Sequence, residues 1–164
     1  MKKVIVADSS PLIAFGSIDQ LSIVFKLFGK VIIPQAVANE CLVEITRPGA
    51  AAIAKAIEAN KIQVHPPIDC QNHAEIRMIL DEGEANAIAL AHSLNLPLVI
   101  DEKLGRGIAK EMGIKIIGTV GILLLVKQKK IVKEIKPILM QLKNGRYFLS
   151  DALIKEALKR AGEK

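Results

Sequence analysis

The chain opens with Lys3-Val4-Ile5-Val6-Ala7-Asp8-Ser9-Ser10-Pro11, an apolar run that ends on a carboxylate. Residues 4–7 are β-branched or small and lack polar alternation, which predicts that the strand over 3–7 is buried on both faces. Ser9 and Ser10 can cap a helix that Pro11 enters in its first turn, where the missing N–H of proline costs nothing. The segment therefore predicts a strand that leads directly into a helix, with an acid at the junction.

This strand–helix unit recurs along the chain. Further short apolar strands are predicted at 31–33, 62–64, 97–100 and 115–117. Helical periodicity covers 19–28, 34–45, 50–60, 73–80, 83–94, 103–112, 119–128, 132–142 and 150–161, with Asp19 as one N-cap and Gly29 and Gly113 as stops. The alternation predicts an α/β fold, a three-layer α/β/α sandwich with a central, mainly parallel sheet and extra C-terminal helices. We expect one domain over 1–164, with a core at 1–125 and a basic helical extension at 126–164.

The composition narrows the class of protein. The chain has 164 residues, of which 51% are hydrophobic and only 3% aromatic, so a core can form without disulfides and the body of the chain is not disordered. The longest nearly apolar run, 116–126, is shorter than the ~20 residues of a membrane span, and Asp8 interrupts any signal-peptide core. Cys41 and Cys70 lack metal or redox spacing and are predicted to be reduced and partly buried. We expect a cytoplasmic protein without membrane association.

The charge is divided unevenly. Up to Asp101 there are eight Lys and Arg against eleven Asp and Glu, a balance of −3, and from Glu102 onward fifteen against six, a balance of +9. The basic part can meet a polyanionic partner, or it can be a lysine-rich solvated surface; the sequence leaves both interpretations open. The lysines that would attract a phosphate backbone are Lys127, Lys129, Lys130, Lys133 and Lys136.

Acids fall where a parallel sheet places its functional crevice, at the carboxyl ends of the strands. Asp8 directly follows the first strand, and Asp101 directly follows the strand at 97–100. Each can be a helix cap, or the two can share one site. Glu40 and Glu84 lie on predicted helices of small or apolar residues, whereas Asp81 and Glu82 are interpreted as first-turn charges.

Four carboxylates in one crevice repel one another unless a cation neutralises them. Hard divalent ions such as Mg²⁺ or Mn²⁺ bind oxygen ligands of this kind. The three histidines show no paired spacing for zinc and are interpreted as surface or helix-packing residues: His65, His73 and His92.

Several short motifs occur in a fixed order. They are Asp-Ser-Ser-Pro-Leu-Ile at 8–13, a strand into Pro34 with Glu40 on the next helix, Gly-Glu-Ala-Asn-Ala-Ile-Ala-Leu-Ala at 83–91, Leu-Val-Ile-Asp at 98–101, Gly105-Arg106, and Ile-Ile-Gly-Thr at 116–119. Together they resemble PIN-domain nucleases over essentially the whole chain, in particular the VapC-like toxin branch. The resemblance implies an endoribonuclease that hydrolyses RNA with water activated by Mg²⁺ or Mn²⁺. A non-cleaving PIN-like module that binds RNA or protein is the alternative.

The resemblance also assigns residues. The catalytic and metal-binding quartet falls on Asp8, Glu40, Glu84 and Asp101, and the adjacent Glu102 can either join or replace Asp101 as a ligand. The position of Glu84 is often Asp in the toxin branch. Ser9 matches a supporting hydroxyl, and we expect Arg106 to contact the RNA backbone and Thr119 to meet phosphate or to cap a helix. As partners it implies RNA, a small antitoxin over the cleft and a homodimer; the few aromatic residues predict that base stacking does not dominate RNA binding.

A haloacid-dehalogenase-type phosphatase also carries an acid after its first strand. It needs a second Asp two residues later, where this chain has Ser10. A P-loop nucleotide site needs a Gly-rich run that ends in Gly-Lys-Ser or Gly-Lys-Thr, and the sequence contains none. Both classes are therefore excluded.

Overall fold

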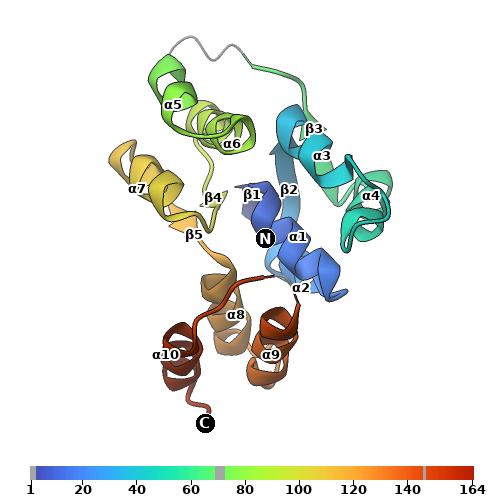
Figure 1. The fold of residues 1–164 in the computed structure, drawn as a ribbon, viewed down its shortest axis with the longest axis vertical. Coiled ribbons are helices and arrows are strands. Elements are labelled where there is room, and N and C mark those ends of the chain that lie inside the picture. The colour runs from blue at the N-terminus through green and yellow to red at the C-terminus, as the bar shows by residue number, and fades with distance from the viewer. Residues whose placement is uncertain (1–2, 69–72, 146) are drawn as a thin grey trace.

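A computed structural model describes residues 3–68, 73–145 and 147–164 of the chain (Figure 1). The strands in these ranges are β1 (Lys3–Ala7), β2 (Phe28–Pro34), β3 (Ile62–His65), β4 (Leu98–Val99) and β5 (Ile116–Ile117). The helices are α1 (Ser9–Ser17), α2 (Leu21–Leu27), α3 (Gln35–Leu42), α4 (Ala50–Glu58), α5 (Ala74–Ile79), α6 (Glu82–Leu94), α7 (Lys103–Glu111), α8 (Thr119–Gln128), α9 (Lys136–Asn144) and α10 (Asp151–Ala161). None of the helices in these ranges is long and apolar enough to cross a membrane.

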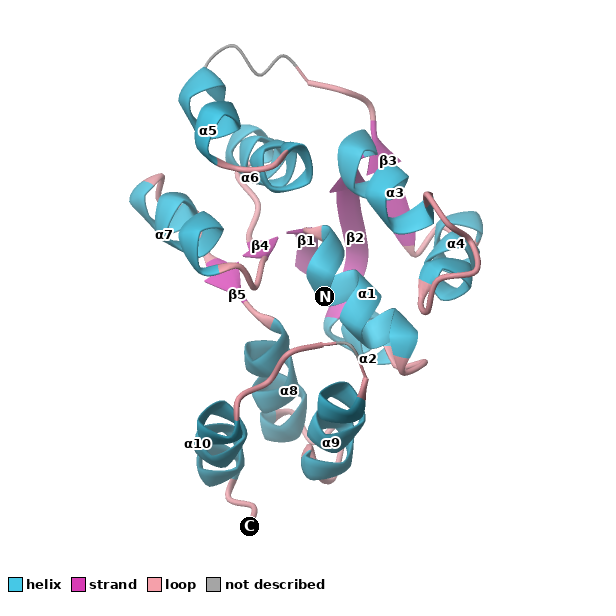
Figure 2. Cartoon of the chain, viewed as in Figure 1, coloured by secondary structure: helices cyan, strands magenta, loops and turns pink. Residues whose placement is uncertain are grey.

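The five strands form one sheet in the order β3-β2-β1-β4-β5, and every neighbouring pair is parallel (Figure 2). β1 lies in the middle, where Val6 is opposite Ile32 on one side and Leu98 on the other. Ile5 and Val6 are buried, as expected for a strand covered on both faces. The predicted α/β architecture with a parallel central sheet is confirmed.

Helix α6 determines what lies above the middle of the sheet. It packs on β1, β2 and β4, and its contacts with the sheet are possible because the helix is rich in small buried residues, among them Ala85, Ala87 and Ala91. Small side chains let a helix approach a sheet closely without leaving gaps. The first turn of α6, which carries Glu84, is thereby placed near the end of β1.

Three predicted boundaries were wrong. Gly29 does not end a helix, because Phe28 pairs with Lys3 in the sheet and β2 has already begun. Asp19 is not an N-cap, since its φ of 57° places it in a left-handed turn and α2 begins two residues later. Lys130, with a φ of 60°, closes the end of α8, and the next helix begins at Lys136 instead of residue 132.

The side chain of Glu163, which follows α10, fixes the start of α9. Glu163 accepts hydrogen bonds from the backbone N–H groups of Ile135 (2.9 Å) and Lys136 (3.1 Å) and from Lys127 Nζ (3.1 Å). Burial by itself would raise the pKa of Glu163, but these three donors together hold the pKa below its usual range. A carboxylate from beyond α10 therefore joins the ends of α8 and α9, and Lys127 is partly committed to it.

Replacing Glu163 by Ala should lower the free energy of unfolding by about 1 to 2 kcal/mol, because two helix-terminal N–H groups lose their acceptor. Guanidinium denaturation followed by far-UV circular dichroism measures the change. Glu156→Ala is the matched control, since Glu156 forms an exposed ion pair with Arg160 on the same helix and caps none of the described helices. Equal destabilisation by the two substitutions would contradict the capping role.

The histidines are not all isolated. His73 Nε2 lies 3.1 Å from Nδ1 of His92 with the rings edge to face, so the pair joins α6 to the residue before α5. Burial, and to a lesser extent His92, lowers the pKa of His73. The helix-packing interpretation holds for this pair, although the sequence did not predict the pairing. Cys41 is free and buried as predicted, and Cys70 lies outside the described residues.

Candidate active site

Asp8 lies at the carboxyl end of the central strand. Its backbone N–H donates to the carbonyl of Val99 in β4 at 2.9 Å, which fixes the residue between the two strands. The side chain is only 3% exposed and makes no capping hydrogen bond to α1. Among the described residues none donates a hydrogen bond to Oδ1 of Asp8. A buried carboxylate oxygen without a donor is costly, so Asp8 is not explained as a helix cap.

Asp101 is held from the next loop along the same edge. Its Oδ1 accepts from the backbone N–H of Thr119 and its Oδ2 from the hydroxyl of Thr119, both at 2.7 Å. Thr119 begins α8 and is fully buried. A β-carbon at Gly118 would lie 2.9 Å from Asp101 Oδ1, so glycine is needed for this close approach. The pair of bonds fixes the orientation of the Asp101 carboxylate.

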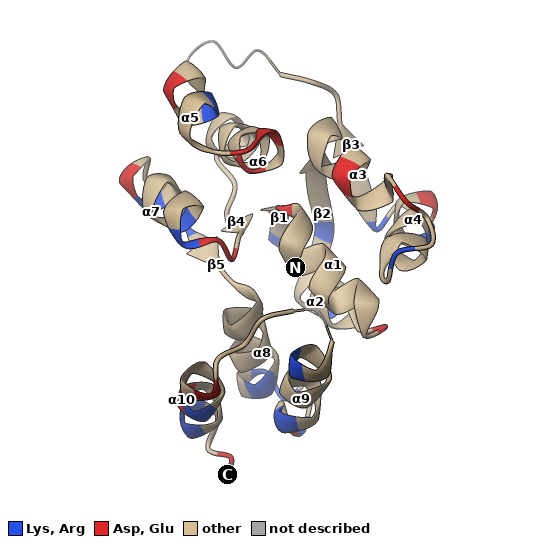
Figure 3. Cartoon of the chain, in the orientation of Figure 1, with Lys and Arg blue, Asp and Glu red and all other residues tan. Residues whose placement is uncertain are grey.

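The remaining acids approach from helices. Asp81 Oδ1 accepts from the backbone N–H of Glu84 at 2.8 Å and so caps α6. Glu40, on α3, lies over the first turn of α6, because a β-carbon at Gly83 would be 2.6 Å from Glu40 Oε2 and 3.6 Å from Asp81 Oδ1. We call Asp8, Glu40, Asp81, Glu84, Asp101 and Glu102 the carboxylate cluster. Figure 3 shows acidic segments of α3, α6 and the start of α7 around the end of β1, with Lys and Arg gathered on α8, α9 and α10.

Burial and mutual repulsion shift the titration of the cluster. The pKa of Asp8 is raised to about 7, mainly by burial and then by the charges of Glu40, Asp81 and Asp101, with the backbone of Ser9 acting in the opposite direction. The pKa of Glu84 is raised to about 8, first by burial and then by its neighbour Asp81. Asp8 and Glu84 therefore resist full ionisation at neutral pH unless positive charge is added.

Comparison with known proteins agrees with this geometry. The family model described as DUF3368, PIN domain, matches residues 4–163. The chain belongs to the PIN-domain family. PIN domains are generally metal-dependent nucleases. No curated protein matches the chain.

The cluster in this PIN domain fits a divalent cation by the chemistry of its donors. All its side-chain donors are carboxylate oxygens, the ligands that Mg²⁺ and Mn²⁺ prefer. Oδ1 of Asp8 is buried without a protein donor in the described chain, and two pKa values are raised by burial and by crowding of negative charge. As the side chains stand, no three His, Cys, Asp or Glu among the described residues converge into a ready metal site.

Glu102 has a different task from its neighbour Asp101. Its Oε1 accepts from the N–H of Leu104 (3.0 Å) and its Oε2 from the N–H of Gly105 (2.6 Å), so both oxygens cap α7. The Asp101 carboxylate is instead held by the backbone and side chain of Thr119. Glu102 thus caps its own helix, whereas Asp101 is bound to the start of α8.

Residues predicted to contact substrate have varied surroundings. Ser9 is buried directly after Asp8 at the start of α1. Arg106 is half-buried and donates from Nη1 to the carbonyl of Ile100 at 2.8 Å, beside Asp101. Thr119 is enclosed, and its hydroxyl points at Asp101 rather than at solvent. The structure thus makes Thr119 a positioning residue for Asp101, while RNA contact by Ser9 and Arg106 stays a prediction.

Tyr147 and Asp81 were missed as site residues. Tyr147, half-buried in the α9–α10 connection, lies close enough to Thr119 and Asp101 for both to act on the pKa of its hydroxyl. Burial, and then the charge of Asp101, raises the pKa of its hydroxyl. The only signal in the sequence was that this is the one tyrosine of the chain. Asp81 caps α6 as expected of a first-turn acid, but its charge also acts on Asp8.

Gly83→Ala should reduce RNA cleavage while leaving the fold at least as stable. The added methyl group meets the far end of the flexible Glu40 side chain, which can move away, and Ala is favoured over Gly in a helix by about 0.5–1 kcal/mol. Thermal unfolding and a cleavage assay measure the two effects. Gly107→Ala on α7 is the control, because a β-carbon there meets nothing within 4 Å. Wild-type cleavage by Gly83→Ala would show that the position of Glu40 does not matter.

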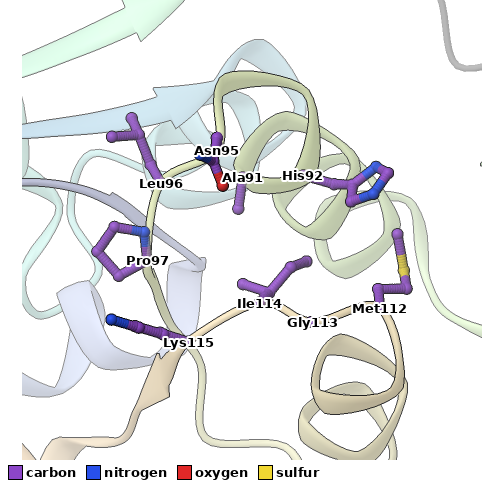
Figure 4. Close-up of a pocket in the computed structure, with 9 residues that line it drawn as sticks. All are labelled: Ala91, His92, Asn95, Leu96, Pro97, Met112, Gly113, Ile114 and Lys115. Carbon is purple, nitrogen blue, oxygen red and sulfur yellow. The ribbon is translucent and has the colours of Figure 1, made fainter.

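The cavity in Figure 4 does not belong to this site. It has a volume of about 540 Å³. It lies at the edge of the sheet where β4 and β5 begin, beside the last turn of α6. Its lining includes residues 95–97 and 113–115. Asp101 follows the other end of β4, so the cavity and the carboxylate cluster lie at opposite edges of the sheet.

Proposed function

We propose that this PIN domain is a divalent-metal-dependent endoribonuclease. The observation that carries the proposal is Asp8, a buried carboxylate on the central strand with an unpartnered oxygen among the described residues, surrounded by further acids. Such a cluster repels phosphate by itself, so it suits a substrate phosphate only when a cation is shared between them.

We assign Asp8 and Asp101 as principal metal ligands, with Glu40 and Glu84 binding through water or orienting the attacking water. A bound Mg²⁺ or Mn²⁺ would lower the pKa of water and neutralise charge on the phosphate. Thr119 holds Asp101 in its orientation through two hydrogen bonds. Arg106, beside Asp101, binds the RNA backbone through its positive charge. Ser9, which directly follows Asp8, supports the site.

The direct test is incubation of the purified protein with total cellular RNA in the presence of Mg²⁺ or EDTA, followed by mapping of the cleaved ends. We expect cleavage with Mg²⁺, none with EDTA and none with Asp8→Asn. Cleavage that persists in EDTA or in Asp8→Asn would point to a contaminating nuclease and would contradict the assignment.

A non-cleaving PIN-like module that binds RNA or protein is the second candidate. Isothermal titration with Mn²⁺ separates the two, because a catalytic site must bind the metal and lose it when Asp8 and Asp101 are both replaced by Asn. A non-cleaving module does not need to bind metal. The acids around Asp8 favour the nuclease, since a binding module gains nothing from their repulsion.

We further propose that the protein belongs to the VapC-like branch, with a small antitoxin as partner and a homodimer as its assembled form. As a toxin it should arrest growth when expressed alone, and Asp8→Asn should remove the arrest. A short neighbouring reading frame that encodes a DNA-binding protein should relieve it. Growth without arrest would instead favour a role in RNA processing.

For the basic extension at 126–164 we propose attraction of the RNA backbone. Lys127 and Lys136 donate to Glu163 and to the carbonyl of Lys164, whereas Lys129, Lys130 and Lys133 are exposed. RNA affinity of Asp8→Asn should therefore fall as salt rises, since backbone contacts release counterions. An RNA affinity that does not change with salt would mean that these lysines form a solvated surface and do not bind the RNA backbone.

A further inference from the structure

A second cavity adjoins the carboxylate cluster. Its volume is about 610 Å³, and it lies between α1, α3, the loop that follows α3, and the α9–α10 connection. Its lining includes the apolar residues Ile13, Ile18 and Pro48 together with Tyr147. Ligand pockets in proteins measure roughly 300 to 1,000 Å³, so the cavity is large enough for a nucleobase with its ribose.

Two residues connect this cavity to the cluster. Glu40 lines the cavity, and its charge acts on Asp8. Tyr147 also lines the cavity, and its hydroxyl lies close to Asp101 and Thr119. A molecule with its phosphate at the carboxylates can therefore extend an attached group into the cavity.

The chemistry of the walls favours a flat, uncharged group. Arg47, which also lines the cavity, is paired with Glu44 at 2.8 Å, and Glu40 adds a carboxylate that disfavours an anionic group. The lining combines the aromatic Tyr147 with polar side chains, among them Ser10 and Ser17. A base can stack on an aromatic ring while its polar edge meets such hydroxyl groups, which suits this lining better than a phosphate.

We propose that this cavity is a nucleobase subsite, in which the base next to the cleaved phosphate stacks on Tyr147. The inference rests on the proposed nuclease function and extends it to the base beside the cleaved phosphate, which must be unpaired to enter. It also limits the expectation drawn from the low aromatic content. Few aromatic residues are present, but the single tyrosine lies at the site.

The protein carries its own probe for this subsite. It contains one tyrosine and no tryptophan, so tyrosine fluorescence reports on Tyr147 alone. Adenosine, cytidine and uridine, added singly to the wild-type protein in EDTA, should quench this emission in a saturable way. Ribose should not quench it, because it lacks the base. Nucleosides avoid phosphate, which the carboxylates repel without metal, and free tyrosine in the same solutions corrects for light absorbed by the base.

Ser17→Leu tests the cavity without removing the probe. Ser17 lines the cavity and its hydroxyl bonds only locally, to the carbonyl of Ala14, so leucine should fill space without unfolding the chain. Nucleoside affinity should fall at least about tenfold, as expected when stacking is blocked. Phe148→Ala is the matched control, since this neighbouring aromatic side chain is 87% exposed and is not part of the described cavity lining. Its affinity for nucleosides should stay at the wild-type value.

Quenching by ribose equal to that by nucleosides, or unchanged affinity in Ser17→Leu, would overturn the subsite. No quenching by any nucleoside would overturn it as well. The readout is independent of cleavage, so the two proposals fail separately. RNA cleavage without nucleoside binding removes only the subsite, whereas nucleoside binding without cleavage leaves the subsite standing and removes the nuclease.

Discussion

Asp8→Asn is expected to abolish metal-dependent RNA cleavage and at the same time to stabilise the metal-free protein at about pH 8. The amide keeps the shape of the carboxyl group but carries no charge next to Glu40, Asp81 and Asp101. The rise of the Asp8 pKa from 3.8 to about 7 corresponds to at most about 4 kcal/mol, and because the buried amide also needs partners we expect a gain of roughly 1 to 3 kcal/mol. Cleavage should fall at least about a thousandfold.

The pH dependence follows from the same shift. The folded-state pKa of Asp8 lies above its unfolded value, so the protonated form favours the fold, and ionisation destabilises it as the pH rises from 3.8 through about 7. In EDTA the melting temperature of the wild type should therefore fall between about pH 5.5 and about pH 8. Asp8→Asn should show a smaller fall, with the part due to Glu84 remaining.

Asp19→Asn serves as the control for this substitution. Asp19 is exposed and has a φ of 57°, a conformation that Asn adopts readily, so stability and cleavage should stay at wild-type values. Thermal unfolding in EDTA at both pH values and the RNA assay with Mg²⁺ are the measurements. A marked loss of stability in Asp8→Asn at about pH 8 would mean that the buried charge of Asp8 does not destabilise the fold there.

Thr119→Val should weaken Mn²⁺ binding and slow cleavage by roughly ten- to a hundredfold, the usual effect of removing a group that orients a metal ligand. Valine has nearly the shape of threonine but cannot donate to Oδ2 of Asp101. The carboxylate also loses a charge-assisted hydrogen bond, which should lower the free energy of unfolding by about 1.5 to 3 kcal/mol. Isothermal titration, RNA cleavage and denaturant unfolding measure the three effects.

Thr119→Ser separates positioning from packing. Serine retains the hydroxyl and removes only a methyl group, so metal affinity should stay near that of the wild type even where stability falls. The orienting role of the Thr119 hydroxyl would be refuted if Thr119→Val bound Mn²⁺ as tightly as the wild type. It would also be refuted if Thr119→Ser lost as much Mn²⁺ affinity as Thr119→Val.

Local patterns in the sequence determined the fold and the place of two acids. The run Lys3–Ala7 predicted a strand because its apolar residues do not alternate with polar ones, and the same held for the strand before Asp101. Since parallel strands point the same way, two acids that follow strands had to lie at one edge of the sheet. The Ala-rich helix that carries Glu84 was also predictable, because its composition shows a closely packed helix.

Contacts between residues far apart in the chain were decided by the tertiary structure alone. Tyr147, from the predicted extension, lies close to Asp101, and Glu163 caps α9. No local pattern encodes such contacts, because they depend on how separate helices pack. The same holds for the raised pKa values of Asp8 and Glu84, since burial and the distance between charges in space set them. The sequence by itself determined which acids reach the sheet edge; only the packing of the helices decided how strongly they repel and what surrounds them.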